Sequence, residues 1–269
     1  MIRLPSRDLP AVATRRLKRY QEKVDAEPDF GRRVQVAVAK FKQFNRTSNP
    51  AFQQVRRTLA LMCSGAKRCM YCEDSAADEV EHHRPKSLYP GHVFAWENYL
   101  YACGPCNGPK DNQFAVFAAD GSIVYLTRKR GELPKPPVPG DPVMLHPRAE
   151  DALKYMTLDI AGGTFLFVPA APEGSHEFER ASYTIEVLRL NSRGHLSRAR
   201  REAYGSYKAR LTEYVHRRDA GDVNHALRYM IDAIMRMPHP TVWFEMRRQS
   251  ARIPELTRLF QLAPEALKW

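Results

Sequence analysis

Apolar residues recur at helical spacing toward both ends of the chain. Phe52, Val55, Leu59 and Met62 follow one another every three or four residues behind Asn49-Pro50. This pattern predicts a helix that begins at that dipeptide. Weaker patterns of the same kind predict helices over residues 11–24, 33–45, 222–236 and 254–260, and a long helix after residue 181 that Asn191-Ser192 would cap.

In the middle of the chain, apolar residues have the shorter spacing that is typical of strands. Residues 122–127 (SIVYLT) predict a strand, residues 135–142 (KPPVPGDP) an extended connector, and residues 157–168 a hairpin that turns at Gly162-Gly163. We therefore expect a mixed α/β fold that is mainly helical. Four regions are predicted: a helical N-terminal region (1–63), a compact module (64–118), a β-rich connector (119–180) and a helical C-terminal region (181–269).

Four of the five cysteines lie in the compact module, as Cys69-x-x-Cys72 and Cys103-x-x-Cys106. Each pair can form a tight turn that presents two thiolates, so the two pairs together predict a tetrahedral zinc site. The gap between the pairs is longer than in a zinc ribbon, which implies that a small unit folds between them. Cys63 is left over and is expected to be a small buried residue.

The net charge of +12 is unevenly distributed. Residues 1–60 hold 14 basic and 5 acidic residues, residues 61–120 hold 5 and 8, and residues 181–269 hold 16 and 9. An acidic module between basic flanks suits a bound cation that a polyanion approaches. Solvated helix faces are the alternative explanation of the basic flanks.

No apolar run approaches the ~20 residues that a membrane-spanning helix needs. The first residues, MIRLPSRDLPAVATRRLKRY, lack the apolar stretch of a signal peptide. Paired CxxC cysteines also fit a reducing compartment. We expect a cytoplasmic protein without a membrane partner.

The ordered motifs of the module resemble a known family. Cys-x-x-Cys, Glu-His-x-x-Pro-Lys, Trp-x-Asn-Tyr-Leu and Cys-x-x-Cys-Asn-x-x-Lys occur in this order between Cys69 and Phe114. The set resembles HNH endonucleases with a ββα-metal active site. The form EHHRPKS…WENYLYACGPCN…K is more similar to the HNH subunits of Septu-type and retron-associated antiphage systems. The segments DPVMLHPRAED and ASYTIEVLRLNSRGHLSRAR resemble the same group less specifically.

The resemblance implies a zinc-stapled ββα-metal HNH module with helical flanks and a small β insertion. It implies that His82 is the general base, that Asn98 orients this base, and that Glu81 and Asn107 bind the catalytic Mg²⁺ or Mn²⁺. Asn107 stands where relatives often have histidine, and His83 where they commonly have an aromatic or apolar residue. In the implied strand–loop–strand–helix order, Glu81-His82 ends the first strand and Asn107 opens the helix, which Pro109 would interrupt early.

Elementary chemistry supports these roles. A neutral histidine, with a reference pKa of ~6.5, can accept a proton near pH 7. A divalent ion held by oxygen ligands can neutralise charge on the scissile phosphate. Arg84, Lys86 and Lys110 are candidate phosphate ligands; for Arg84 and Lys110 a solvated charge is an equal alternative.

The sequence therefore predicts a metal-dependent HNH endonuclease that cuts DNA or RNA, leaving 5′-phosphate and 3′-hydroxyl ends as the resemblance implies, in bacterial antiphage defence. The resemblance to Septu-type systems also implies an ABC-like ATPase partner subunit, and the sequence has no GxxxxGK[ST] loop of its own. The alternatives are a zinc-dependent nucleic-acid-binding module without catalysis and a scaffold subunit.

Overall fold

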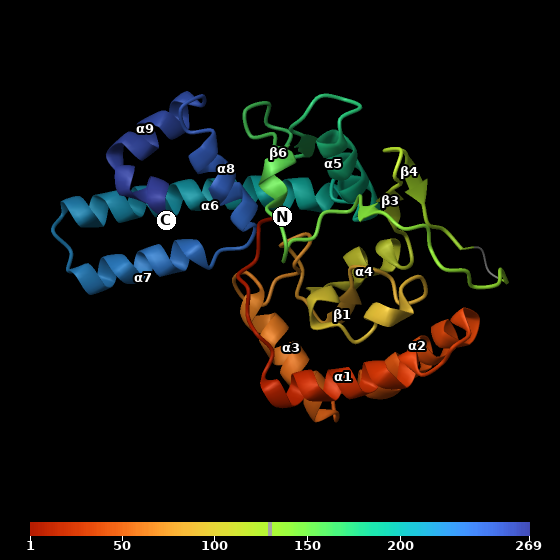
Figure 1. Cartoon of the computed structure of the whole chain (residues 1–269). Helices are drawn as coiled ribbons and strands as arrows, with labels where there is room; N and C mark the ends of the chain where they lie inside the picture. The colour runs from red at the N-terminus through yellow and green to blue at the C-terminus, as the bar shows by residue number, and fades with distance from the viewer. Residues whose placement is uncertain (129–130) are drawn as a thin grey trace.

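A computed structural model describes residues 1–128 and 131–269. Three helices form the N-terminal region, at the bottom of Figure 1. They are α1 (Ala11–Asp25), α2 (Phe30–Phe44) and α3 (Pro50–Met62). The side chain of Asn49 accepts a hydrogen bond from the Ala51 N–H, which satisfies one of the free donors of the first turn of α3. The predicted start of this helix is therefore confirmed.

A two-stranded antiparallel hairpin and a short helix follow. Strand β1 (Glu79–His82) pairs with β2 (Tyr99–Ala102), so that Glu81 lies opposite Leu100 and His82 opposite Tyr99. Helix α4 (Gly104–Lys110) comes next; it begins three residues before Asn107, which was expected to open it, and ends one residue after Pro109. The connection between the strands contains the 3₁₀ turns η1 (Pro90–His92) and η2 (Trp96–Asn98). The order strand, loop, strand, helix is the one that the sequence predicted.

Two small sheets lie beyond the hairpin. In the first, β3 (Ala115–Phe117) pairs with both β4 (Ile123–Tyr125) and β5 (Asp141–Pro142). The second follows the 3₁₀ turn η3 (Ala152–Lys154) and consists of β6 (Met156–Leu158) and β7 (Phe167–Pro169). Gly163 has a φ of +73°, which glycine adopts without steric cost, so the predicted hairpin and its turn are confirmed.

The C-terminal region is helical, with the long helix α6 running across the top half of Figure 1. Its elements are α5 (His176–Val187), α6 (Gly194–Asp219), α7 (Asn224–Met235), α8 (Pro240–Arg248), α9 (Pro254–Leu262) and the 3₁₀ turn η4 (Pro264–Lys268). Helix α8 was not predicted from the sequence. Pro240 occupies the first turn of α8, where the missing N–H has no helical partner in any case.

The predicted cap of the long helix was wrong. Asn191 does not cap α6; its side chain accepts from the Phe167 N–H at 2.9 Å and donates to the Phe167 carbonyl at 2.7 Å. Asn191 therefore continues the backbone pairing of the β6–β7 hairpin. Helix α5 also begins earlier than expected, because Ser175 caps it by accepting from the Phe178 N–H.

Buried polar contacts join the two helical regions to the central module. Glu73 is buried beside the first cysteine pair and accepts hydrogen bonds from the N–H and the hydroxyl of Thr241 in α8, at 3.0 and 2.8 Å. The Met1 ammonium lies 3.2 Å from Glu73. These contacts place the cysteine pairs in the interior of the fold. None of the helices that the structure describes is long and apolar enough to cross a membrane.

Candidate functional site

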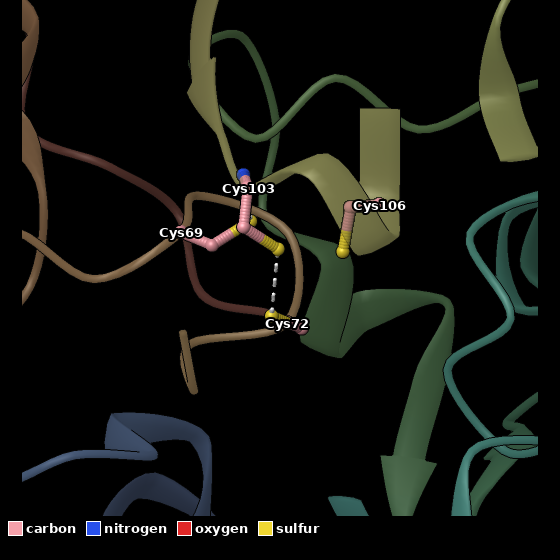
Figure 2. A group of neighbouring side chains, drawn as sticks. All are labelled: Cys69, Cys72, Cys103 and Cys106. Carbon is pink, nitrogen blue, oxygen red and sulfur yellow. Dashed lines mark hydrogen bonds between the residues drawn. The ribbon is translucent and has the colours of Figure 1, made fainter. Parts of the chain in front are cut away.

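The four cysteines of the two pairs converge, as Figure 2 shows. Cys69 and Cys72 come from the turn between α3 and β1, whereas Cys103 and Cys106 come from the start of α4. All four are buried free thiols, and their sulfur atoms lie within 4.8 Å of one another. The 3.7 Å between the sulfurs of Cys72 and Cys103 is close to the ~3.8 Å edge of a tetrahedron with ~2.3 Å zinc–sulfur bonds. This cysteine cluster fits the predicted structural zinc site.

Hydrogen bonds to sulfur surround the cysteine cluster. The N–H groups of Tyr71 and Cys103 donate to the Cys69 sulfur at 3.5 and 3.4 Å, and the Arg193 guanidinium donates to the Cys106 sulfur at 3.2 Å. Such donors stabilise thiolate, the form of cysteine that binds zinc. Burial alone would lower the pKa of Arg193, but the Cys106 thiolate outweighs it and raises this pKa. Arg193 was missed because it lies 87 residues from Cys106 in the sequence.

A cavity of about 410 Å³ opens where β1 meets α4 and the N-terminal helices. The predicted general base, His82, and the predicted ion ligands, Glu81 and Asn107, line this first cavity. Lys86 lines it as well, and Phe41 of α2 and Arg56 of α3 form part of its wall. The structure therefore brings the predicted base and both predicted ligands of the catalytic ion to one place, and the N-terminal helices help to enclose them.

His82 is held in one orientation by its surroundings. Its Nε2 lies 2.9 Å from the Val93 carbonyl oxygen, and its ring packs against Phe41 and Tyr99. A carbonyl oxygen can only accept, so Nε2 carries the proton and Nδ1 keeps the lone pair. Burial first, and Lys86 second, lower the pKa of His82 to about 3, which keeps the ring neutral at pH 7. Only 3% of the surface of His82 is exposed.

Asn98 fixes the loop that follows His82. Its side-chain oxygen accepts from the Arg84 N–H at 2.7 Å, and its amide donates to the carbonyls of Arg84 and His92 at 3.1 and 3.0 Å. Asn98 thus ties the segment after β1 to the η1 turn by three hydrogen bonds. None of these three bonds reaches the His82 ring, whose own partner is the Val93 carbonyl, and Asn98 does not line the first cavity.

Glu81 is buried and lies next to Lys110. The Lys110 ammonium is 2.5 Å from Glu81 Oε1 and donates to the His82 carbonyl at 2.8 Å, with no exposed surface of its own. Burial raises the pKa of Glu81, and the charge of Lys110 opposes this rise. Lys110 therefore holds α4 against β1, a different position from the exposed phosphate ligand considered in the sequence analysis.

Asn107 contacts a carboxylate that the sequence analysis did not select. Its amide donates to Glu79 Oε2 at 2.5 Å, and Glu79 also lines the first cavity. Alternate residues of a strand point to the same face, so the position of Glu79 two residues before Glu81 could have revealed it. Asp78 and Asp111 add further acidic groups to this wall.

The predicted phosphate ligands separate into two places. Lys86 lines the first cavity, with its ammonium 5.7 Å from the centre of the Phe41 ring. Arg84 lines a second cavity together with His83, and its guanidinium lies 5.0 Å from the centre of the Tyr89 ring. Cys63 lies outside the cysteine cluster, and burial raises its pKa to about 12, which makes its thiol unreactive.

Part of the chain is similar to a known protein. No known family profile matches the chain. Over 74 residues the chain is 36% identical to the Septu protein PtuB of Bacillus thuringiensis. The aligned stretch covers 26% of this chain and 29% of that protein, so the chain matches less than a third of the relative's length. This similarity supports a relationship to Septu-type defence systems.

Proposed function

We propose that the protein is a metal-dependent HNH endonuclease that hydrolyses phosphodiester bonds of nucleic acid in a defence system. The observation that carries this proposal is the first cavity, where Glu81, His82 and Asn107 meet beside the cysteine cluster. A purely structural zinc module has no need of a neutral histidine, a buried carboxylate and an amide around one cavity.

His82 would act as the general base. Because Nε2 donates to the Val93 carbonyl, Nδ1 is the atom that would take a proton from the attacking water. A pKa of about 3 makes this nitrogen a weak base in the free protein. Burial is the main cause of this low pKa and the charge of Lys86 the second, so a substrate phosphate next to Lys86 would raise the pKa by offsetting the second cause.

Glu81 and Asn107 would hold the catalytic ion, with Glu79 beside them. Carboxylate and amide oxygens suit Mg²⁺ or Mn²⁺, and the sulfur ligands of the cysteine cluster suit Zn²⁺. When bound, the divalent ion would neutralise charge on the phosphate and on the leaving oxygen. Lys110 would keep Glu81 in place through Oε1.

The substrate is DNA or RNA. Lys86 at the first cavity and the net charge of +12 favour a polyanion. The similarity to a Septu protein supports a role in antiphage defence, and we propose that an ABC-like ATPase subunit is the partner.

A panel of substrates tests the proposal. The purified protein is incubated with supercoiled plasmid, single-stranded DNA and total RNA, with Mg²⁺, with Mn²⁺ or with EDTA. We expect cleavage of at least one substrate that requires the added ion, with 5′-phosphate and 3′-hydroxyl ends. Binding without cleavage under all of these conditions would instead support the non-catalytic binding module.

A further inference from the structure

A second cavity of about 490 Å³ lies beside the segment that follows β1. It is formed by residues 83–84, by the connection between β1 and β2, and by residues 146–149, which belong to the DPVMLHPRAED segment. The polar residues that line it include His83, Arg84, His92, Asn98, His146 and Arg148. The proposed nuclease mechanism uses the first cavity and leaves this one without a role.

His83 is the polar group that the surrounding protein does not satisfy. Its side chain is 97% buried, and neither ring nitrogen has a hydrogen-bond partner in the part of the chain that the structure describes. His146 packs against it, with 4.3 Å between the ring centres, but is fully bonded: Nε2 donates to the Glu97 carbonyl and Nδ1 accepts from the Arg148 N–H. A buried polar group without a partner is costly, so His83 indicates that a ligand group completes this cavity.

Two arginines give the second cavity a positive balance. The Arg148 guanidinium is fixed by hydrogen bonds to the carbonyls of Trp96 and Tyr99, both 2.6 Å long, and lies over the Trp96 ring. Arg84 lies against the rings of Tyr89 and Phe114. Neither arginine forms an ion pair with a carboxylate within residues 1–128 and 131–269. The exposed Glu97, which also lines the cavity, provides one opposing charge.

We propose that the second cavity binds a phosphate group through Arg84, Arg148 and the ring of His83. Guanidinium groups and a ring N–H are the donors that phosphate oxygens accept from. The cavity has the size of a small-molecule site rather than of one phosphate group, so the phosphate belongs to a nucleotide unit. This unit is either a free nucleotide or part of a nucleic-acid strand. The inference requires nucleotide binding alone and holds whether or not the first cavity cleaves.

Binding measurements test the inference with the zinc-loaded full chain and without Mg²⁺ or Mn²⁺, so that no substrate is cut. The probes are inorganic phosphate, AMP and a short single-stranded oligonucleotide. We expect saturable binding of AMP, of the oligonucleotide or of both. Binding of AMP would identify a free nucleotide as a source of the bound phosphate group. Binding of the oligonucleotide alone would identify a nucleic-acid strand as that source.

Three variants locate the bound phosphate. Arg84→Gln should weaken binding about tenfold or more, because a charged hydrogen-bond donor is lost. His83→Phe should weaken it as well, while its melting temperature stays at or above that of the wild type, because a buried unsatisfied group is removed. Arg198→Gln, on the exposed face of α6, is the matched control and should bind like the wild type.

The inference is overturned if no probe binds saturably, or if Arg84→Gln and His83→Phe both bind like the wild type. These outcomes differ from a failure of the proposed nuclease. If the protein cleaves while Arg84→Gln and His83→Phe both bind nucleotide like the wild type, only the second site is ruled out. If the protein binds nucleotide without cleaving, only the proposed nuclease is ruled out.

Discussion

The cysteine cluster and the first cavity share helix α4 but differ in what they require of the chain. Cys103 is the N-cap residue of α4 and Cys106 lies in its first turn, and both are buried in the cysteine cluster, whereas Asn107 and Lys110 contact carboxylates of β1. The cysteine cluster is uniform and buried, so its loss should affect folding. The cavity combines carboxylates, an amide and a histidine, so its loss should affect chemistry. Substitutions a few residues apart should therefore separate an effect on stability from an effect on activity.

The largest expected effect concerns the cysteine cluster. Cys103→Ser should abolish zinc binding and most of the folded population, because structural zinc contributes about 10 kcal/mol or more in small zinc domains. Elemental analysis of the wild type should find about one zinc per chain, as a four-ligand site implies. Cys63→Ser is the matched control and should keep both zinc and fold. A folded wild type without zinc would contradict the assignment.

The variant Lys110→Met tests whether Lys110 stabilises the fold or binds a phosphate. Removing one member of a buried ion pair leaves Glu81 unpaired, which typically costs about 3–5 kcal/mol. Denaturant unfolding measures this loss. Lys86→Met should leave stability unchanged and weaken nucleic-acid binding. If Lys110→Met unfolds like the wild type but loses substrate binding, Lys110 is a phosphate ligand after all.

Acid should destabilise the protein through His146. Burial lowers its pKa to about 4 against an ordinary value of 6.5, and its Nδ1 is occupied by the Arg148 N–H. The unfolded chain therefore binds the proton first, and the stability from this residue is lost as the pH falls below 6.5. Between pH 7 and pH 5 the loss should be about 2 kcal/mol.

His146→Asn keeps an acceptor near the position of Nδ1 and should reduce the pH dependence by that amount. Denaturant unfolding at the two pH values measures the difference, with zinc content checked at both. An unchanged pH dependence in His146→Asn would show that this histidine does not titrate differently on folding.

Glu79→Gln should have the smallest of these effects, and it acts on the metal rather than on the fold. Its carboxylate orients Asn107, and outer-shell partners of metal ligands typically contribute about 10–100-fold in affinity. The Mg²⁺ concentration for half-maximal cleavage should rise about tenfold, with melting temperature unchanged. Glu97→Gln, outside the first cavity, serves as the control. Equal Mg²⁺ requirements in the two variants would exclude Glu79 from the site.

Much of the local structure could be predicted from the sequence. Residue spacing revealed α1, α2, α3 and the β6–β7 hairpin, and the motif order gave the β1–β2–α4 unit with the cysteine cluster. These features depend on neighbouring residues or on side chains with one dominant chemistry. The start of α8 at Pro240 was missed because a proline is equally consistent with a break.

Contacts between residues far apart in the chain could not be predicted from the sequence. Nothing local distinguishes the buried Lys110 from the Lys86 that lines the cavity, since burial depends on how α4 packs against β1. Arg193 beside Cys106 and the pairing of His83 with His146 are likewise set by tertiary packing. Glu79 could have been predicted, because the alternation of side chains along a strand places it on the same face as Glu81.

The central claim is that hydrolysis takes place at His82 in the first cavity. The most direct test compares cleavage by the wild type, His82→Asn and His83→Phe at equal zinc content, on the same substrate and with Mg²⁺ present. Asparagine keeps a donor for the Val93 carbonyl and limits the loss of packing that alanine would cause. His82→Asn should cleave ~10²–10⁴ times more slowly than the wild type, whereas His83→Phe should retain measurable cleavage. Rapid cleavage by His82→Asn, or its loss in His83→Phe alone, would contradict the account.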